Sequence, residues 1–322
     1  MNRSNQLVRV VVNCANRKTK APLSDLRLRG YPKTLEIRAT RWIDRIKSPE
    51  SEPIEANDLY QGEHWSVVRK IVETADEVGC RADVWVVSAG YGLVPVKALV
   101  EPYSATFSSG SADSVAQGES GKNSQEANRD WWGLLMNWSG PCRQDPRSLT
   151  DLARQDTSAP MLVALSNTYV QAVRDDLIGA TEAMGDKADL LLVSTGRPPE
   201  GLEETQLPCD ARLVNTLGGT RTSLNARVAD HIVRRSPDHG FDATGVKKML
   251  QRKIRRSGEI PRYDHRNRMS DEAVRAQIRA RRRNGDREPS CASLLRELRD
   301  GGFACEQKRF AGLYKEVVSD PR

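Results

Sequence analysis

The chain has 322 residues and a mass of 35.9 kDa, more than one compact core usually holds, so we expect two domains. Hydrophobic residues make up 38% of the sequence, and the mean hydropathy is −0.60. No uninterrupted apolar run approaches the roughly 20 residues that a membrane-spanning helix needs, which excludes an integral membrane protein of that kind. Six cysteines without a CxxC spacing, and a start unlike a secretory signal, predict a cytoplasmic protein with reduced thiols.

Charge is distributed unevenly along the sequence. The whole chain carries 50 basic and 43 acidic residues, a formal net charge of +7. Residues 241–322 alone carry 21 basic and 12 acidic residues, which leaves 29 basic and 31 acidic residues for the first 240. A nearly neutral body with a basic tail favours a polyanionic partner, most simply nucleic acid. Composition does not separate DNA from RNA, and a solvated, arginine-rich helical surface is the alternative.

Four apolar runs have the length and the branched composition of buried strands. They cover residues 7–12, 84–87, 161–165 and 190–193, and a weaker fifth run covers 212–215. Segments of helical character lie around them, at residues 34–45, 64–78, 169–184 and 224–235. Continuous apolar strands that alternate with helices predict the α/β class, with a mainly parallel central sheet flanked by helices.

The basic tail is expected to form its own small domain. A turn-forming stretch at residues 236–240 gives an α/β domain over residues 1–237 and a basic helical domain over residues 238–322. Helical patterns at 244–254, at 270–283, from 289 and at 305–317 are compatible with a helix-turn-helix or winged-helix module. Three-helix scaffolds that bind nothing share this pattern, so nucleic-acid binding by the tail is a hypothesis.

The most specific stretch is residues 87–108, VSAGYGLVPVKALVEPYSATFS. Glycines on both sides of Tyr91 allow the backbone to approach a ligand, and two prolines stiffen the segment. The stretch resembles the SA/SG-x-YG-L-x-P…PY signature of the YaaA family, which belongs to the domain-of-unknown-function class. Four further segments resemble that family in the same order: residues 13–19 (NCANRKT), 58–62 (DLYQG), 131–133 (WWG) and 165–169 (LSNTY). The resemblance covers residues 8–235 and leaves out the basic tail.

The resemblance implies a DNA-binding protein whose sheet is distantly similar to uracil-DNA-glycosylase-like folds and to an anti-phage glycosylase that removes a modified cytosine. We therefore expect a DNA glycosylase-type hydrolase that cleaves the bond between nucleobase and sugar. It would act on a modified base in phage DNA and leave abasic sites, with duplex DNA as its partner. The alternatives are a non-catalytic DNA-binding protein of stress protection or defence, and an enzyme that exchanges bases in tRNA.

Ligands of parallel sheets bind beyond the carboxyl ends of the strands, which selects the candidate site residues. An oxocarbenium-like transition state requires a carboxylate or a positioned water, so the catalytic candidates are Asn13, Glu36, Glu101 and Asn225. The substrate-binding candidates, for stacking, base reading and phosphate contact, are Lys18, Ser88, Tyr91, Tyr103, Asn167, Thr220 and Arg221. Other interpretations remain open. Tyr91 and Tyr103 could pack the loop against the sheet, and Glu36 could form a surface ion pair with a neighbouring arginine.

No metal or cofactor is expected. The four histidines have no metal-ligand spacing, and His64 is expected to be structural. The glycine pair before Thr220 lacks the GK[ST] of a Walker loop, so nucleotide hydrolysis has no support. Cys14 has no evident histidine or aspartate partner in the sequence.

Overall fold

The computed structural model describes residues 6–118, 123–185, 189–259, 267–283 and 289–319. The chain divides into two compact units, Met1–Gly258 and Glu259–Arg322. This boundary lies after α11 (Ala243–Arg256), later in the chain than the expected boundary at residues 236–240. The reason is that α11 buries Val246, Leu250 and Ile254 in the core of the first unit. The expected division into residues 1–237 and 238–322 therefore assigns α11 to the wrong unit.

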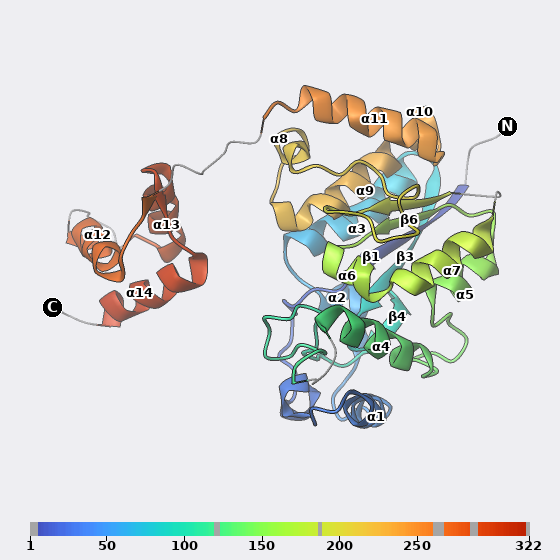
Figure 1. Ribbon diagram of the computed structural model, residues 1–322, viewed down its shortest axis with the longest axis horizontal. Coiled ribbons are helices and arrows are strands. Elements are labelled where there is room, and N and C mark those ends of the chain that lie inside the picture. Colours follow the sequence, from blue (N-terminus) through green and yellow to red (C-terminus); the bar gives the residue numbers. More distant parts are fainter. Residues whose placement is uncertain (1–5, 119–122, 186–188, 260–266, 284–288, 320–322) are drawn as a thin grey trace. The chain divides into compact units, whose positions relative to one another are not determined.

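The first unit is built on a five-stranded sheet in the order β4-β3-β1-β6-β7 (Figure 1). The parallel strands are β1 (Gln6–Asn13), β3 (Cys80–Ser88), β6 (Met161–Ala164) and β7 (Leu190–Val193). β4 (Gly92–Pro95) pairs antiparallel with β3. In the central strand, Val10 lies opposite Val84 on one side and Leu162 on the other, and all three are buried. The α/β class, the mainly parallel sheet and the four principal strands are thus confirmed.

Helices cover both faces of this sheet, as Figure 1 shows. α3 (Glu63–Glu77) and α9 (Leu224–Arg234) pack together on one face, where α3 contacts β3 and α9 contacts β6 and β7. α5 (Leu149–Gln155) and α7 (Arg174–Met184) pair on the other face. α3 lies in the crossover from β1 to β3, whereas α5 and α7 lie in the crossovers from β3 to β6 and from β6 to β7, which run the other way across the sheet, so right-handed connections place them on opposite faces. α4 (Ser124–Met136) contacts both α1 (Leu35–Ile46) and α6 (Asn167–Ala172).

Short elements complete the first unit. They are η1 (Ser24–Leu26), η2 (Leu28–Gly30), β2 (Ile54–Glu55), α2 (Ala56–Leu59), β5 (Leu99–Val100), η3 (Ala211–Leu213), α8 (Val214–Leu217), η4 (Arg221–Ser223) and α10 (Ser236–His239). β2 and β5 form a separate two-stranded sheet. The weak fifth strand expected at residues 212–215 is wrong, because η3 and α8 occupy that segment. The expected helix at residues 169–184 is two helices, α6 and α7, which meet at Val173.

Among residues 267–283 and 289–319, the second unit contains three helices and a two-stranded parallel sheet. They are α12 (Asp271–Arg283), α13 (Cys291–Asp300), α14 (Gln307–Ser319), β8 (Asn267–Arg268) and β9 (Phe303–Ala304). The core of this unit includes Val274, Ile278, Leu294, Leu298 and Phe310. In the described part of the chain, no helix is long and apolar enough to cross a membrane.

Candidate functional site

The carboxyl ends of β1, β3 and β6 meet at one edge of the sheet, and the loops that follow them are joined there. The Cys14 amide donates to the carbonyl of Val87 at the end of β3, at 3.1 Å. The Ser166 amide donates to Asn13 Oδ1 across 3.3 Å, which ties the end of β6 to the end of β1. The polar strand ends that the sequence predicts as the ligand site therefore form one continuous region.

A chain of buried hydroxyl and thiol groups lies at this edge. We call it the hydroxyl cluster, and its members are Cys14, Tyr60, Ser88, Tyr103 and Tyr169. The Tyr103 hydroxyl lies 2.7 Å from Ser88 Oγ and 2.8 Å from the Tyr60 hydroxyl, and Cys14 Sγ lies 3.2 Å from the Tyr169 hydroxyl. At most 6% of any of these residues is exposed.

The tyrosines of the hydroxyl cluster are neutral at physiological pH. Burial raises the pKa of Tyr60, Tyr103 and Tyr169 well above the ordinary value of a phenol, because a phenolate loses its hydration there. Either oxygen of each hydroxyl pair can act as the donor. The cluster can therefore donate hydrogen bonds, or pass a proton along, without carrying charge.

The loop after β3 holds Tyr103 in place by close contact. A Cβ atom on Gly90 would lie 2.5 Å from both Cδ2 and Cε2 of the Tyr103 ring, so only glycine permits this approach. Ser88 Oγ accepts from the amides of Gly90 and Tyr91 at 3.2 and 3.0 Å. The indole of Trp42 donates to the Gly90 carbonyl at 2.7 Å. The loop is a rigid support for one face of the cluster.

Lys18 contacts the hydroxyl cluster from the loop after β1. Its Nζ lies 4.2 Å from the centroid of the Tyr103 ring and 5.6 Å from that of Tyr60, and it donates to the Ala15 carbonyl at 3.0 Å. The side chain is half-buried, whereas the tyrosines that it covers are buried. Burial lowers the pKa of the amine. Lys18 is thus the partly accessible, basic member of this region.

His64, expected to be structural, lies at the start of α3 next to the end of β1. Burial lowers the pKa of its imidazole to about 4, although a hydrogen bond with the Asn13 backbone acts in the opposite direction. Its Nε2 is buried and has no hydrogen-bond partner within the described part of the chain. The imidazole is therefore neutral at pH 7.

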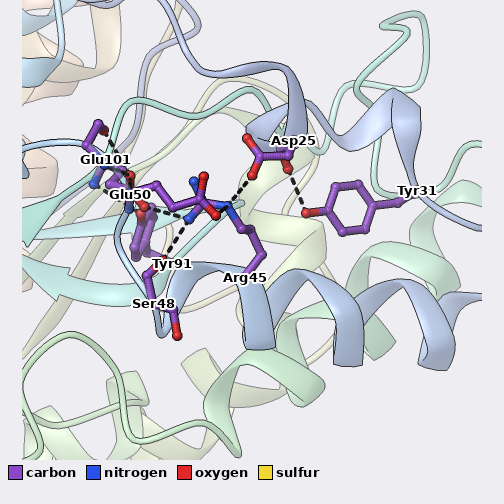
Figure 2. Close-up of polar contacts among 8 residues, drawn as sticks. Asp25, Tyr31, Arg45, Ser48, Glu50, Tyr91 and Glu101 are labelled. Atoms are coloured by element: carbon purple, nitrogen blue, oxygen red, sulfur yellow. Dashed lines mark hydrogen bonds and ion pairs between the residues drawn. The ribbon is translucent and has the colours of Figure 1, made fainter.

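Glu101, expected to be catalytic, is committed to a different network. Figure 2 shows its carboxylate bound by Arg45 on α1, with Nη1 at 2.9 Å, and by the loop that follows α1. The Ser51 amide and hydroxyl donate to Oε1 at 2.7 and 2.9 Å, and the Glu50 amide does so at 3.0 Å. Burial alone would raise the pKa of Glu101, but the bonds from Arg45 and Ser51 lower it. The carboxylate anchors a loop and contacts no member of the hydroxyl cluster.

Glu36 and Tyr91 also lie outside the cluster. Glu36 is exposed on α1, and its neighbour Arg38 is instead buried and donates to backbone carbonyls, including that of Val115 at 2.6 Å. The Tyr91 ring packs edge-on against Tyr103, and its hydroxyl accepts from the Glu101 amide at 3.1 Å. Of the expected tyrosine pair, only Tyr103 reaches the strand-end hydroxyls.

Two of the expected catalytic residues hold backbone together. Asn13 Nδ2 donates to the Cys14 carbonyl at 3.0 Å, and the Asn13 oxygen accepts from Ser166 as described above. Asn225 on α9 is buried, and its Nδ2 donates to the Leu165 carbonyl at 2.7 Å. Both amides lie at the strand ends, as expected, and both stabilise the conformation of the loops there.

The loop expected to bind phosphate is occupied by a carboxylate of the protein itself. Glu63 Oε1 accepts from the Thr220 amide at 3.0 Å, from Ser223 Oγ at 2.8 Å and from Arg227 Nη2 at 2.7 Å. The bond from Arg227 is the main reason that the pKa of Glu63 falls to about 2. The Thr220 amide is therefore not available to a phosphate in this conformation. Arg221 is exposed beside it, and Asn167 is exposed at the start of α6.

Sequence reasoning missed three members of the hydroxyl cluster: Cys14, Tyr60 and Tyr169. The last two lie in the segments DLYQG and LSNTY, which support the family resemblance but are not selected there as site residues. Their convergence depends on the sheet order, in which β1 lies between β3 and β6. The tyrosine within each segment is the signal that could have found them.

A basic surface lies on α11 of the first unit. The helix carries six basic residues and no acidic one: Lys247, Lys248, Arg252, Lys253, Arg255 and Arg256. Four of these side chains are exposed, those of Lys248, Arg252, Arg255 and Arg256. A cavity of about 570 Å³ adjoins the helix and is lined by Arg255, Gln251 and the connector after β7. By contrast, residues 259–322 carry 15 basic and 11 acidic residues, so much of the basic excess of the tail belongs to α11.

No family model matches the chain, and neither a curated protein nor a solved structure is significantly similar to it. Within the described ranges, no three His, Cys, Asp or Glu side chains are grouped so that they could hold a metal ion.

Proposed function

We propose that the protein is a DNA glycosylase-type hydrolase that cleaves the bond between a nucleobase and its sugar, as the YaaA resemblance implies. The observation that carries this proposal is the hydroxyl cluster beside Lys18, at the strand ends where α/β proteins bind ligands. An extruded base needs aromatic faces and polar groups that read its edge. Tyr103, Ser88 and Lys18 bring groups of these kinds together at one place, with Lys18 as the partly exposed member.

The hydroxyl cluster is suited to the departing base. As the glycosidic bond breaks, negative charge develops on the base, and neutral donors aimed at it lower the barrier. The pKa values of the buried tyrosines keep their hydroxyls protonated, so that they can donate. The Tyr103 hydroxyl is the central donor in this proposal, because it can accept from both Ser88 and Tyr60 and then has its own proton for the base.

The same compact unit carries the basic surface of α11. Phosphate contacts by lysine and arginine supply most of the affinity of a protein for DNA. For the second unit we retain a helix-turn-helix-like role in DNA binding, supported by α13 and α14 with the Gly301–Gly302 turn between them.

The test compares plain duplex DNA with phage DNA that contains modified bases, and measures released base by mass spectrometry together with abasic sites. We expect base release from modified DNA, and a loss of about 100-fold or more in Tyr103→Phe, which keeps the ring and removes the donor. Tyr31→Phe is the matched control, because the Tyr31 hydroxyl bonds to the Asp25 carbonyl, outside the cluster. Equal rates for Tyr103→Phe and wild type would refute the role of the cluster.

A non-catalytic DNA-binding protein is the second candidate. It is favoured by the positions of Glu36 and Glu101, since neither carboxylate contacts the hydroxyl cluster. Salt-sensitive binding of both DNAs without any base release would support this candidate and contradict the first.

A further inference from the structure

The hydroxyl cluster contains no carboxylate, and the side-chain amides of Asn13 and Asn225, which could position a water, bind backbone groups instead. An attacking nucleophile on the protein would therefore be one of the other side chains. The candidate Glu101 binds Arg45, the candidate Glu36 is exposed on α1, and Glu63, which is not a candidate, binds Arg227. Cys14 is buried, and its sulfur contacts the Tyr169 hydroxyl. Lys18 remains, with a half-buried amine.

We propose that Lys18 is an amine nucleophile that forms a Schiff base with the sugar of the DNA. This inference rests on the proposed glycosylase function and names the group that attacks C1′. It replaces the expected role of Lys18 as a phosphate contact.

The backbone around Lys18 is fixed, so the amine is positioned before DNA binds. The Thr19 amide donates to the Leu59 carbonyl at 2.8 Å, and the Gln61 amide donates to the Arg17 carbonyl at 2.9 Å. Lys18 itself forms a β-bridge with Tyr60. These bonds, one on each side of Lys18, connect the loop after β1 to the end of α2 and to the residues that follow it, and the Lys18 side chain lies over the tyrosine rings.

Burial of the Lys18 amine favours its nucleophilic form, against the aromatic rings and the carbonyl around it, which favour the charged form. No described carboxylate lies within ion-pair distance of it, and its contacts are the Tyr103 and Tyr60 rings and the Ala15 carbonyl. Cys14 and Asp113 act in the opposite direction and raise the pKa of the amine, and Asp113 is itself paired with Arg29 and Ser104. Burial is the larger effect and lowers the pKa, which favours the uncharged amine, and an uncharged amine attacks carbon.

The proposed steps balance without an oxidant or a reductant. Nζ attacks C1′, and the N–C1′ bond forms as the bond from C1′ to the base breaks. The base leaves with the electron pair and takes one amine proton through a hydroxyl of the cluster. The C1′–O4′ bond then opens, the second amine proton passes to O4′, and an imine joins Nζ to C1′. Water hydrolyses this imine to an abasic aldehyde and the free amine.

The test traps the imine on the full-length protein. The probe is duplex DNA with one preformed abasic aldehyde site, and sodium cyanoborohydride reduces the imine to a stable secondary amine. We expect a covalent adduct between protein and DNA whose cross-linked peptide contains Lys18. Lys18→Ala and Lys18→Arg should lose the adduct by about 100-fold or more, as expected when a nucleophile is removed.

Controls separate attack by Lys18 from general amine reactivity. Lys20→Ala removes an exposed lysine two positions away and should leave the yield of adduct unchanged. Lys18→Arg keeps a long basic side chain and should not weaken DNA binding, so the absence of adduct in this variant would reflect the missing amine rather than a loss of affinity. Thermal unfolding of each variant shows whether the packing of Lys18 on Tyr103 is needed for folding.

The outcomes distinguish this inference from the proposed function. Base release from modified DNA without an adduct at Lys18 would overturn the inference and keep the glycosylase. An adduct at Lys18 without base release from any DNA would keep the inference and contradict the glycosylase. An adduct on other lysines alone, unchanged in Lys18→Ala, would overturn the inference.

Discussion

Arg45 and Glu101 form an ion pair, with Nη1 and Oε2 2.9 Å apart, which joins α1 to the segment after β5. The Glu101 side chain is 1% exposed and that of Arg45 is 11% exposed, so both charges are largely removed from water. Figure 2 shows that Arg45 also binds Asp25, whose carbonyl accepts from Tyr31. The pair connects three segments of the chain, and a structural role follows from these contacts.

Glu101→Gln is expected to destabilise the fold and to leave the chemistry intact. The substitution removes the buried charge that Arg45 Nη1 binds, while Asp25 still pairs with Arg45, so we expect a cost of about 1–3 kcal/mol, as for a buried group that loses one bonding partner. The free energy of unfolding in urea measures this cost, and Glu36→Gln at the exposed position should stay within about 0.5 kcal/mol of wild type. A Glu101→Gln protein of normal stability that releases no base would identify Glu101 as catalytic instead.

Gly90→Ala is expected to disturb the hydroxyl cluster. The new methyl group would lie 2.5 Å from two carbons of the Tyr103 ring, so the ring has to move away from Ser88 and Lys18. Overpacking of this kind costs about 1–3 kcal/mol. We expect a lower melting temperature and slower base release.

Gly133→Ala is the matched control for this substitution. Gly133 lies in α4, and a Cβ atom there would meet nothing within 4 Å. Alanine should stabilise the helix by about 0.5–1 kcal/mol. If both variants had the same stability and activity, the close approach of Gly90 to Tyr103 would have no consequence.

The free energy of unfolding is expected to fall in acid, in part because the Glu63 carboxylate becomes protonated. The fold lowers its pKa from 4.5 to about 2, mainly through the bond from Arg227, so the folded state favours the carboxylate. This contribution is present above the unfolded pKa and is lost as the pH falls from about 5 towards 2. Unfolding measured between pH 6 and pH 3 should show a weaker pH dependence in Glu63→Gln than in wild type. Glu36→Gln should keep the wild-type dependence, and an unchanged slope in Glu63→Gln would contradict the ion pair.

Local sequence patterns predict the strands of the sheet well. The valines of β1 and the leucines of β7 form continuous apolar runs because helices cover both faces. β4 was missed because it is a four-residue strand that begins at Gly92. The Arg147 guanidinium holds it by donating to the Tyr91 and Leu93 carbonyls, and the sequence around Gly92 contains no sign of that contact.

The sequence predicts where in the sheet the candidate site lies, but it does not predict most of the members of the hydroxyl cluster. Asn13 and Ser88 mark strand ends in the sequence, but Tyr60 and Tyr169 reach them only through the tertiary fold. Glu101 is separated from Arg45 by 56 positions, so its ion pair was invisible to pattern reasoning. An apolar stripe at every fourth residue of α11, which ends in Ile254, could have shown that this helix packs against a core.

Charge reversal on α11 is expected to weaken DNA binding. Arg252, Arg255 and Arg256 are exposed and have no described acidic neighbour on their helix, so each can contact a phosphate. Changing all three to Glu should lower the affinity for duplex DNA at least tenfold and reduce the dependence of log Kd on log salt by roughly three, one per contact. Exposed Lys20, Lys70 and Arg81, each changed to Glu, form the matched control and should have a smaller effect. The α11 variant could bind DNA like wild type while Arg296→Glu on α13 reduced the affinity. In that case the second unit would carry the DNA contact, and α11 would serve only to pack against the core of the first unit.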